Sequence, residues 1–188
     1  FRTTGCMDYL VGGIGALVVR QGIEVPPQMR GGGQEMGRRA GTENLIGIAG
    51  FAAAAEAAAR DLADGVWDRV AELRNILESQ LSAAAFETIS VGNGSPRLPN
   101  TLCLIAPAWK GETQVMAMDL AGFAISAGSA CSSGKVRASR VLTAMGFDQA
   151  LAAQAIRVSL GPGVTKDDVG RFAKTWTAAY AKARARAA

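Results

Sequence analysis

One cysteine lies in a segment made almost entirely of small residues. Residues 126–134 have the sequence SAGSACSSG, so the neighbours of Cys131 are only serine, alanine and glycine. A structural cysteine is usually buried among large apolar residues, whereas small neighbours leave the sulfur accessible and glycines leave the backbone mobile. Because the thiolate is the reactive form of cysteine, the segment predicts a nucleophile or sulfur carrier at Cys131. On these residues alone, a surface turn that contains a cysteine is the alternative.

A second candidate is Arg157, in the sequence IRVSLG over residues 156–161. Side chains alternate across a strand, so Arg157 and Ser159 should share one face and the apolar residues between them the other. The guanidinium group is a planar fork of donors that suits a carboxylate. On these residues alone a surface arginine on an edge strand is the expectation, and binding of a substrate carboxylate is the alternative.

Thr42 is a third candidate, because it directly precedes a long apolar helical pattern. As the N-cap of that helix, its hydroxyl would accept a hydrogen bond from a backbone N–H of the first turn. The N-terminus of a helix also attracts phosphate groups. We expect Thr42 to serve as N-cap, as phosphate ligand, or as both.

Four segments in this order resemble the cysteine desulfurases, which are pyridoxal-phosphate enzymes of the class V aminotransferase superfamily. The resemblance runs from about residue 12 to the C-terminus and corresponds to the C-terminal half of a family member. It implies an α/β fold of PLP-dependent transferase fold type I, with the end of the large domain and the small C-terminal α+β domain. The four segments are residues 31–44 (GGGQEMGRRAGTEN), 98–102 (LPNTL), 125–146 and 156–161.

The resemblance assigns a role to each candidate. Cys131 would be the catalytic residue that takes the sulfur of L-cysteine as a persulfide, leaving L-alanine, and passes it to an acceptor or scaffold protein for iron–sulfur cluster assembly or thiolation. It also implies Cys131 as a transient iron–sulfur ligand, with no other metal. Arg157 would bind the substrate carboxylate. Thr42, in the sequence RAGT over residues 39–42, would contact the phosphate of the partner subunit's pyridoxal 5'-phosphate in a homodimer.

The chain departs from the family before the strand sequence GIGAL of residues 13–17. Family members carry Ser-x-His-Lys there, including the Schiff-base lysine, whereas residues 4–8 read TGCMD and the chain has no histidine. We therefore expect a truncated or processed C-terminal fragment that is inactive by itself. The alternatives are a selenocysteine lyase or other class V aminotransferase, and a non-enzymatic truncated pseudogene product or interaction module.

Composition narrows the classes of protein. With 49% hydrophobic and 19% charged residues the chain fits a soluble globular protein, and no apolar run approaches the ~20 residues that span a bilayer. The net charge of +4 comes from scattered basic residues, which does not favour nucleic-acid binding. Three cysteines without a CxxC pair argue against a disulfide framework and a zinc site, and favour the cytoplasm. Cys103, within an apolar strand pattern, is expected to be a core residue.

The resemblance implies three parts, and hydrophobic periodicity predicts the helices and strands within them. Residues 1–42 would be the tail of the large cofactor-binding domain, with a buried strand over 15–20 and a long loop over 26–41. Residues 43–85 would be a connecting helix, kinked near Gly65, and residues 86–188 the small C-terminal domain with a mobile cysteine loop. In that last part we expect strands over residues 101–105, 124–126 and 155–160, and helices over 112–120, 137–145 and from a capping box at 165–168 onward.

Overall fold

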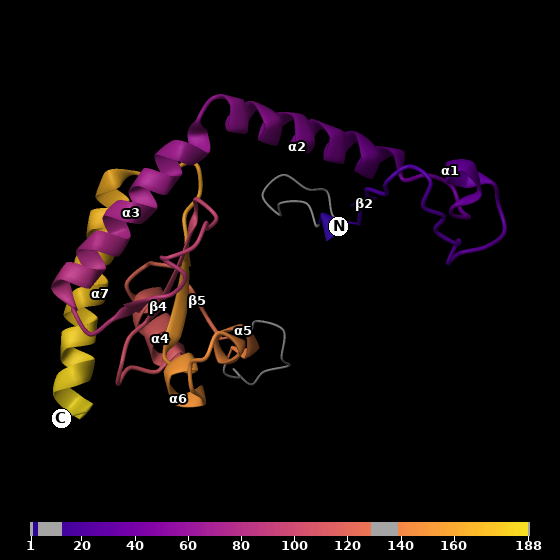
Figure 1. Ribbon diagram of the computed structural model, residues 1–188. Helices are drawn as coiled ribbons and strands as arrows, with labels where there is room; N and C mark the ends of the chain where they lie inside the picture. The colour runs from indigo at the N-terminus through magenta and orange to yellow at the C-terminus, as the bar shows by residue number, and fades with distance from the viewer. Residues whose placement is uncertain (1, 4–12, 129–138, 188) are drawn as a thin grey trace. The chain divides into compact units, whose positions relative to one another are not determined.

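The structure, a computed structural model, describes residues 2–3, 13–128 and 139–187 (Figure 1). The chain divides into two compact units, Phe1–Asp64 and Gly65–Ala188, each of which is described by itself. Cys131 lies outside the described residues. Within the described part, no helix has both the length and the apolar character needed to cross a membrane.

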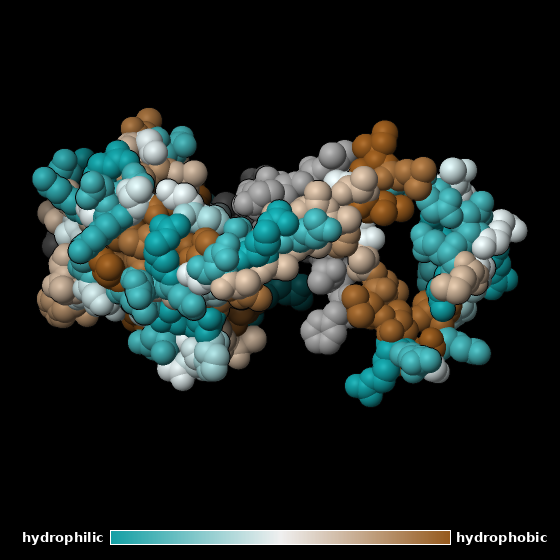
Figure 2. Space-filling view, turned by 90° about the horizontal axis from the view of Figure 1, so that it is seen from above, coloured by the Kyte–Doolittle hydropathy of each residue, from teal (hydrophilic) through white to brown (hydrophobic). Residues whose placement is uncertain are grey.

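The first unit holds little regular structure before its main helix. Strands β1 (Arg2–Thr3) and β2 (Ala16–Leu17) form a short antiparallel pair, and α1 (Gln34–Gly37) is a single turn within the predicted loop. The prediction of a buried strand over residues 15–20 is wrong: β2 has two residues, both exposed, because no described residue of this unit covers it. Figure 2 colours the exposed apolar residues of this unit brown, and Leu17 is 63% exposed.

The predicted connecting helix consists of two helices, α2 (Leu45–Ala63) and α3 (Val66–Ala84). Gly65 separates them, with a φ of 69° in the left-handed region that glycine adopts without a steric penalty. The interruption predicted at Gly65 is therefore confirmed. It coincides with the boundary between the two compact units.

The second unit contains a four-stranded antiparallel sheet in the order β3-β4-β6-β5. The predictions for β4, β6, α4 and α7 are confirmed within one residue at almost every boundary, and β5 lies slightly later than expected. Two elements were not predicted, β3 and α6, because two and four residues are too few to show a period. The strands are β3 (Ile89–Ser90), β4 (Thr101–Ile105), β5 (Ser126–Ala127) and β6 (Ala155–Ser159), and the helices after α3 are α4 (Gly111–Leu120), α5 (Arg140–Ala144), α6 (Gln149–Ala152) and α7 (Lys166–Ala187).

One face of this sheet packs against α3, α4 and α7, and α3 lies alongside α7 (Figure 1). The alternate residues Leu102 and Leu104 of β4 face the main core, together with the completely buried Trp176 of α7. The opposite face carries a smaller apolar cluster near α5 and α6. The predicted capping box at the start of α7 is confirmed: the Asp168 N–H donates to Thr165 Oγ1 at 3.2 Å and the Thr165 N–H donates to the Asp168 carboxylate at 3.0 Å. This packing fixes β6 between β4 and β5.

Candidate functional site

Arg157 lies in the middle of β6, between two other strands. Its neighbours along the strand, Ile156 and Val158, are buried in the main core, whereas Arg157 and Ser159 are exposed on the opposite face. The alternation predicted from the sequence is therefore confirmed, although β6 is a central and not an edge strand. The guanidinium group projects from a strand that is held on both sides, which restricts where its backbone can move.

Two residues flank Arg157 across the sheet. Cys103 of β4 is its partner on one side, and Ser126 of β5 is its partner on the other. Directly paired residues of antiparallel strands project on the same face. Arg157 therefore lies in a row with one thiol and one hydroxyl group, both only partly exposed.

The hydrogen bonds around β4 and β6 define how close Cys103 and Arg157 lie. The Leu160 N–H donates to the Asn100 carbonyl at 2.8 Å, and the Ala106 N–H donates to the Gln154 carbonyl at 3.3 Å. Since hydrogen-bonded and non-hydrogen-bonded pairs alternate along an antiparallel ladder, these two bonds make Cys103–Arg157 a non-hydrogen-bonded pair. In such a pair the strands approach most closely, at about 4.5 Å between Cα atoms, and the two side chains are in direct reach of one another.

The environment of Cys103 differs from the expected one. Its side chain is half-buried against the smaller apolar cluster instead of the main core, and it shares the face of Arg157. Burial raises the pKa of the Cys103 thiol, and the nearby Arg157 charge opposes this effect. The thiol is accordingly neutral at neutral pH. Sequence reasoning missed this pairing because the alternation within β4 does not reveal which strand lies next to it.

Cys131 follows β5 in the chain, within the segment 129–138 that lies outside the described residues. The described chain reaches that segment through Ser126 and Ala127 of β5 and then Gly128, which has a φ of 63°. Ser126 is itself the partner of Arg157. The strand that leads into the cysteine segment is thus the strand beside Arg157.

The helix that follows Thr42 is capped by a different residue. The side chain of Asn44 accepts a hydrogen bond from the Gly47 N–H at 3.0 Å, so Asn44 and not Thr42 is the N-cap of α2. Asparagine is preferred over threonine at this position, which explains why the prediction of Thr42 as N-cap is wrong. Thr42 is exposed two residues earlier. Three residues earlier than Thr42, Arg39 donates to the Glu35 carboxylate and to the Gly41 carbonyl, at 3.0 and 2.9 Å.

The described residues fit one end of a pyridoxal phosphate cofactor. The exposed Thr42 hydroxyl, close to the first turn of α2, is a suitable donor for a phosphate group. The described lysines are all exposed and belong to the second unit, where they offer no enclosed site for an aromatic ring. No group of three or more metal-ligating side chains occurs among the described residues. These lysines are Lys110, Lys166, Lys174 and Lys182.

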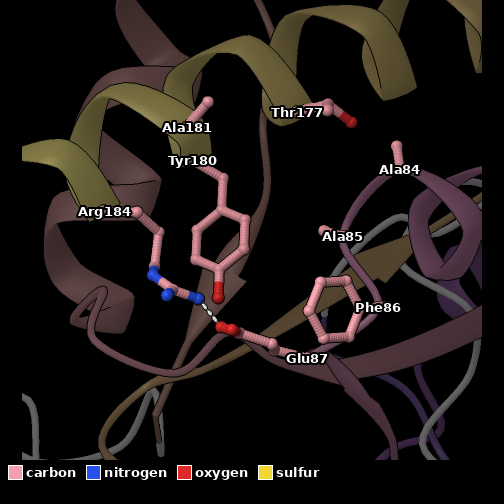
Figure 3. Close-up of a pocket in the computed structure, with 8 residues that line it drawn as sticks. All are labelled: Ala84, Ala85, Phe86, Glu87, Thr177, Tyr180, Ala181 and Arg184. Atoms are coloured by element: carbon pink, nitrogen blue, oxygen red, sulfur yellow. Dashed lines mark ion pairs between the residues drawn. The ribbon is translucent and has the colours of Figure 1, made fainter.

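A hollow of about 230 Å³ lies between α7 and the turn after α3 (Figure 3). Phe86, 87% exposed, and Tyr180 border it, and Arg184 forms an ion pair with Glu87 at its rim. None of the candidate residues lines this hollow. The candidate row lies on the sheet face opposite the main core and is separate from this depression.

Comparison with known proteins identifies the class of protein to which this α+β arrangement belongs. The sequence profile of the aminotransferase class-V family matches residues 11–172. This match covers most of the chain, and the chain belongs to the class-V aminotransferase family.

Individual relatives carry more specific names than the family. A cysteine desulfurase of Gluconacetobacter diazotrophicus is 42% identical over 172 residues, which is 92% of this chain and 43% of the relative. Among solved structures, a NifS-like protein from Rickettsia africae superposes with a TM-score of 0.73 at 30% identity, covering 85% of this chain and 41% of that one. A structure of SspA in complex with cysteine matches with a TM-score of 0.50 at 26% identity, covering 75% and 37%. The chain spans about two fifths of the length of the curated relatives it matches.

Proposed function

We propose that this chain forms part of a cysteine desulfurase, which converts L-cysteine to L-alanine and takes up the sulfur on Cys131. The observation that carries the proposal is the position of Arg157, exposed on the inner strand β6 on the face opposite the main core and paired with the strand that leads to Cys131. The relatives named cysteine desulfurase, and the neighbour bound to cysteine, support the same substrate. Arg157 would bind the α-carboxylate of cysteine through two parallel hydrogen bonds.

Arg157 and Cys131 would each contribute a distinct step of the reaction. Arg157 fixes the carboxylate and thereby orients the substrate sulfur. The Cys131 thiolate attacks that sulfur, a new S–S bond forms, the substrate C–S bond breaks, and its electron pair stays with the organic product, which gains a proton to become alanine. Electron withdrawal from the substrate is the chemistry that bound pyridoxal phosphate supplies. The persulfide on Cys131 is then the form in which sulfur leaves for an acceptor protein.

The remaining parts of the proposal follow from the resemblance to the family. Thr42 would contact the cofactor phosphate of a second subunit in a cytoplasmic homodimer, and the sulfur would serve iron–sulfur cluster assembly or thiolation. Residues 1–42, 43–85 and 86–188 would correspond to the end of the large domain, a connecting segment and the small domain. No step of this proposal requires nucleic acid or a membrane.

Arg157 variants test the proposal in a complete enzyme, made by joining this chain to the N-terminal portion of a cysteine desulfurase relative. Arg157→Ala should raise the KM for L-cysteine by roughly ten- to a hundredfold, because a charge-assisted pair is worth ~1.5 to 3 kcal/mol. Arg157→Lys should restore binding only in part, since an ammonium group lacks the fork. Arg186→Ala, which removes the same charge at the exposed end of α7, is the matched control. An unchanged KM in Arg157→Ala, with cofactor affinity reduced instead, would assign Arg157 to another role.

A further inference from the structure

Arg157 has neutral cross-strand neighbours. Among the described arginines, Arg39, Arg97, Arg171 and Arg184 are ion-paired with a carboxylate, and Arg157, like several others, is not. An acidic residue directly opposite Arg157 would form a cross-strand ion pair and occupy the guanidinium group. The residue at this closest pairing position is Cys103.

We infer that Cys103 is a positioning residue for substrate binding: its neutral thiol, directly opposite Arg157 on β4, supports the arginine side chain while leaving the guanidinium donors available for a carboxylate. The inference rests on the proposed role of Arg157. A carboxylate at residue 103 would lie at the closest cross-strand distance and would occupy the same fork that the substrate needs. A thiol is a weak hydrogen-bond acceptor and does not compete in this way.

The burial of Cys103 agrees with this role. Its side chain is half-buried against the smaller apolar cluster, which limits the orientations it can adopt. Burial raises the pKa of the thiol and thereby keeps it neutral beside the arginine. On the other side of Arg157, the Ser126 hydroxyl is likewise uncharged. The guanidinium group is therefore the only charged group in this three-residue row.

The kinetic test replaces the thiol with groups of similar size in the complete enzyme. Cys103→Asp should raise the KM for L-cysteine roughly tenfold or more with little change in kcat, because the new carboxylate competes with the substrate before any chemistry occurs. Cys103→Asn, which is similar in shape and uncharged, should change the KM much less. Thr101→Asp, which adds the same charge on the same face two residues away along β4, should also have a smaller effect.

A second measurement works on the chain itself and needs no enzyme activity. In a Cys6→Ser, Cys131→Ser background, the rate of Cys103 alkylation by iodoacetamide as a function of pH gives the pKa of this thiol. Adding Arg157→Ala should raise that pKa, because the neighbouring positive charge is lost.

The outcomes separate the inference from the proposed function. If Arg157→Ala raises the KM for L-cysteine but Cys103→Asp does not, or Thr101→Asp raises it equally, Cys103 has no positioning role and the proposed function stands. If Arg157→Ala leaves the KM unchanged, the proposed function fails. An unchanged Cys103 pKa in the Arg157→Ala chain would show that the two side chains do not interact, which overturns the inference even where Cys103→Asp fails to fold.

Discussion

Replacing Gln114 should destabilise the second unit more than any other single polar substitution in it. This side chain on α4 is completely buried and joins three parts of the fold. Its Nε2 group donates to the Trp109 carbonyl at 2.8 Å and to the Gln154 carbonyl at 2.9 Å. Its Oε1 atom accepts from the Trp176 indole N–H at 3.1 Å. Gln114→Leu removes all three hydrogen bonds and keeps a side chain of similar length.

The size of the effect follows from these contacts. Each lost hydrogen bond contributes about 1 kcal/mol net, and a buried donor left without an acceptor, here the indole N–H of Trp176, adds about 1 to 3 kcal/mol. The apolar gain of leucine offsets part of this. We expect a loss of about 3 to 5 kcal/mol in the free energy of unfolding, which is a large fraction of the stability of a small domain.

Urea denaturation monitored by tryptophan fluorescence measures this quantity, because all three tryptophans belong to the second unit. Gln149→Leu, on the exposed surface of α6, is the control and should change stability by less than about 0.5 kcal/mol. The Gln114→Glu protein should become more stable as the pH is lowered. Burial raises the pKa of the new carboxyl in the folded state, so the cost of ionising it is absent below its unfolded-state pKa and grows as the pH rises from there. A loss below about 1 kcal/mol in Gln114→Leu would show that these hydrogen bonds contribute nothing beyond ordinary packing.

Three further substitutions test individual parts of the fold. Asp168→Ala should lower the melting temperature by removing the capping box of α7. The pKa of Asp168 is lowered to about 2, chiefly because the Thr165 hydroxyl donates to it. The stability that the capping box adds should therefore be present above the ordinary pKa of 3.8 and be lost as the pH falls through about 2. Asn44→Ala should weaken α2 by about 1 kcal/mol in amide hydrogen exchange, whereas Thr42→Ala should not, and an equal effect of both would contradict the assignment of the cap. Gly111→Ala would place a methyl carbon 2.6 Å from the carbonyl oxygen of the first residue of β6, and should cost about 1 to 3 kcal/mol in thermal unfolding; a neutral result would show that this contact relaxes freely.

The regular elements of the second unit could be predicted where they are long enough to show a period. The apolar face of α7 and the alternation of β4 and β6 are strong local signals, and the structure has these elements almost where they were expected. By contrast, β3 is defined by its pairing with β4 further along the chain, and α6 is a single turn too short to show a period. The strand expected over residues 15–20 was also predicted incorrectly from local sequence, because apolar composition favours a buried strand only where a neighbouring layer covers it.

Only part of the candidate site could be predicted from the sequence. The face on which Arg157 lies could be predicted from its own strand, since side chains alternate with a period of two. That Cys103 and Ser126 lie beside Arg157 could not be predicted, because the order and register of strands in a sheet are set by tertiary packing. The cap of α2 was misassigned to Thr42 because several suitable residues precede the helix and the hydrogen bond of Asn44 decides among them.

The proposed function requires that Cys131 receives the sulfur of L-cysteine. The complete enzyme, carrying pyridoxal phosphate, would be incubated with L-cysteine, treated with an alkylating agent that traps persulfides, and digested for mass spectrometry. Cys6→Ser is the control, because it removes another thiol of the chain and leaves the proposed carrier intact. One additional sulfur atom is expected on the peptide that contains Cys131, retained in Cys6→Ser and absent, together with alanine production, in Cys131→Ser. Full alanine production by Cys131→Ser, or additional sulfur found on Cys103 instead, would contradict it.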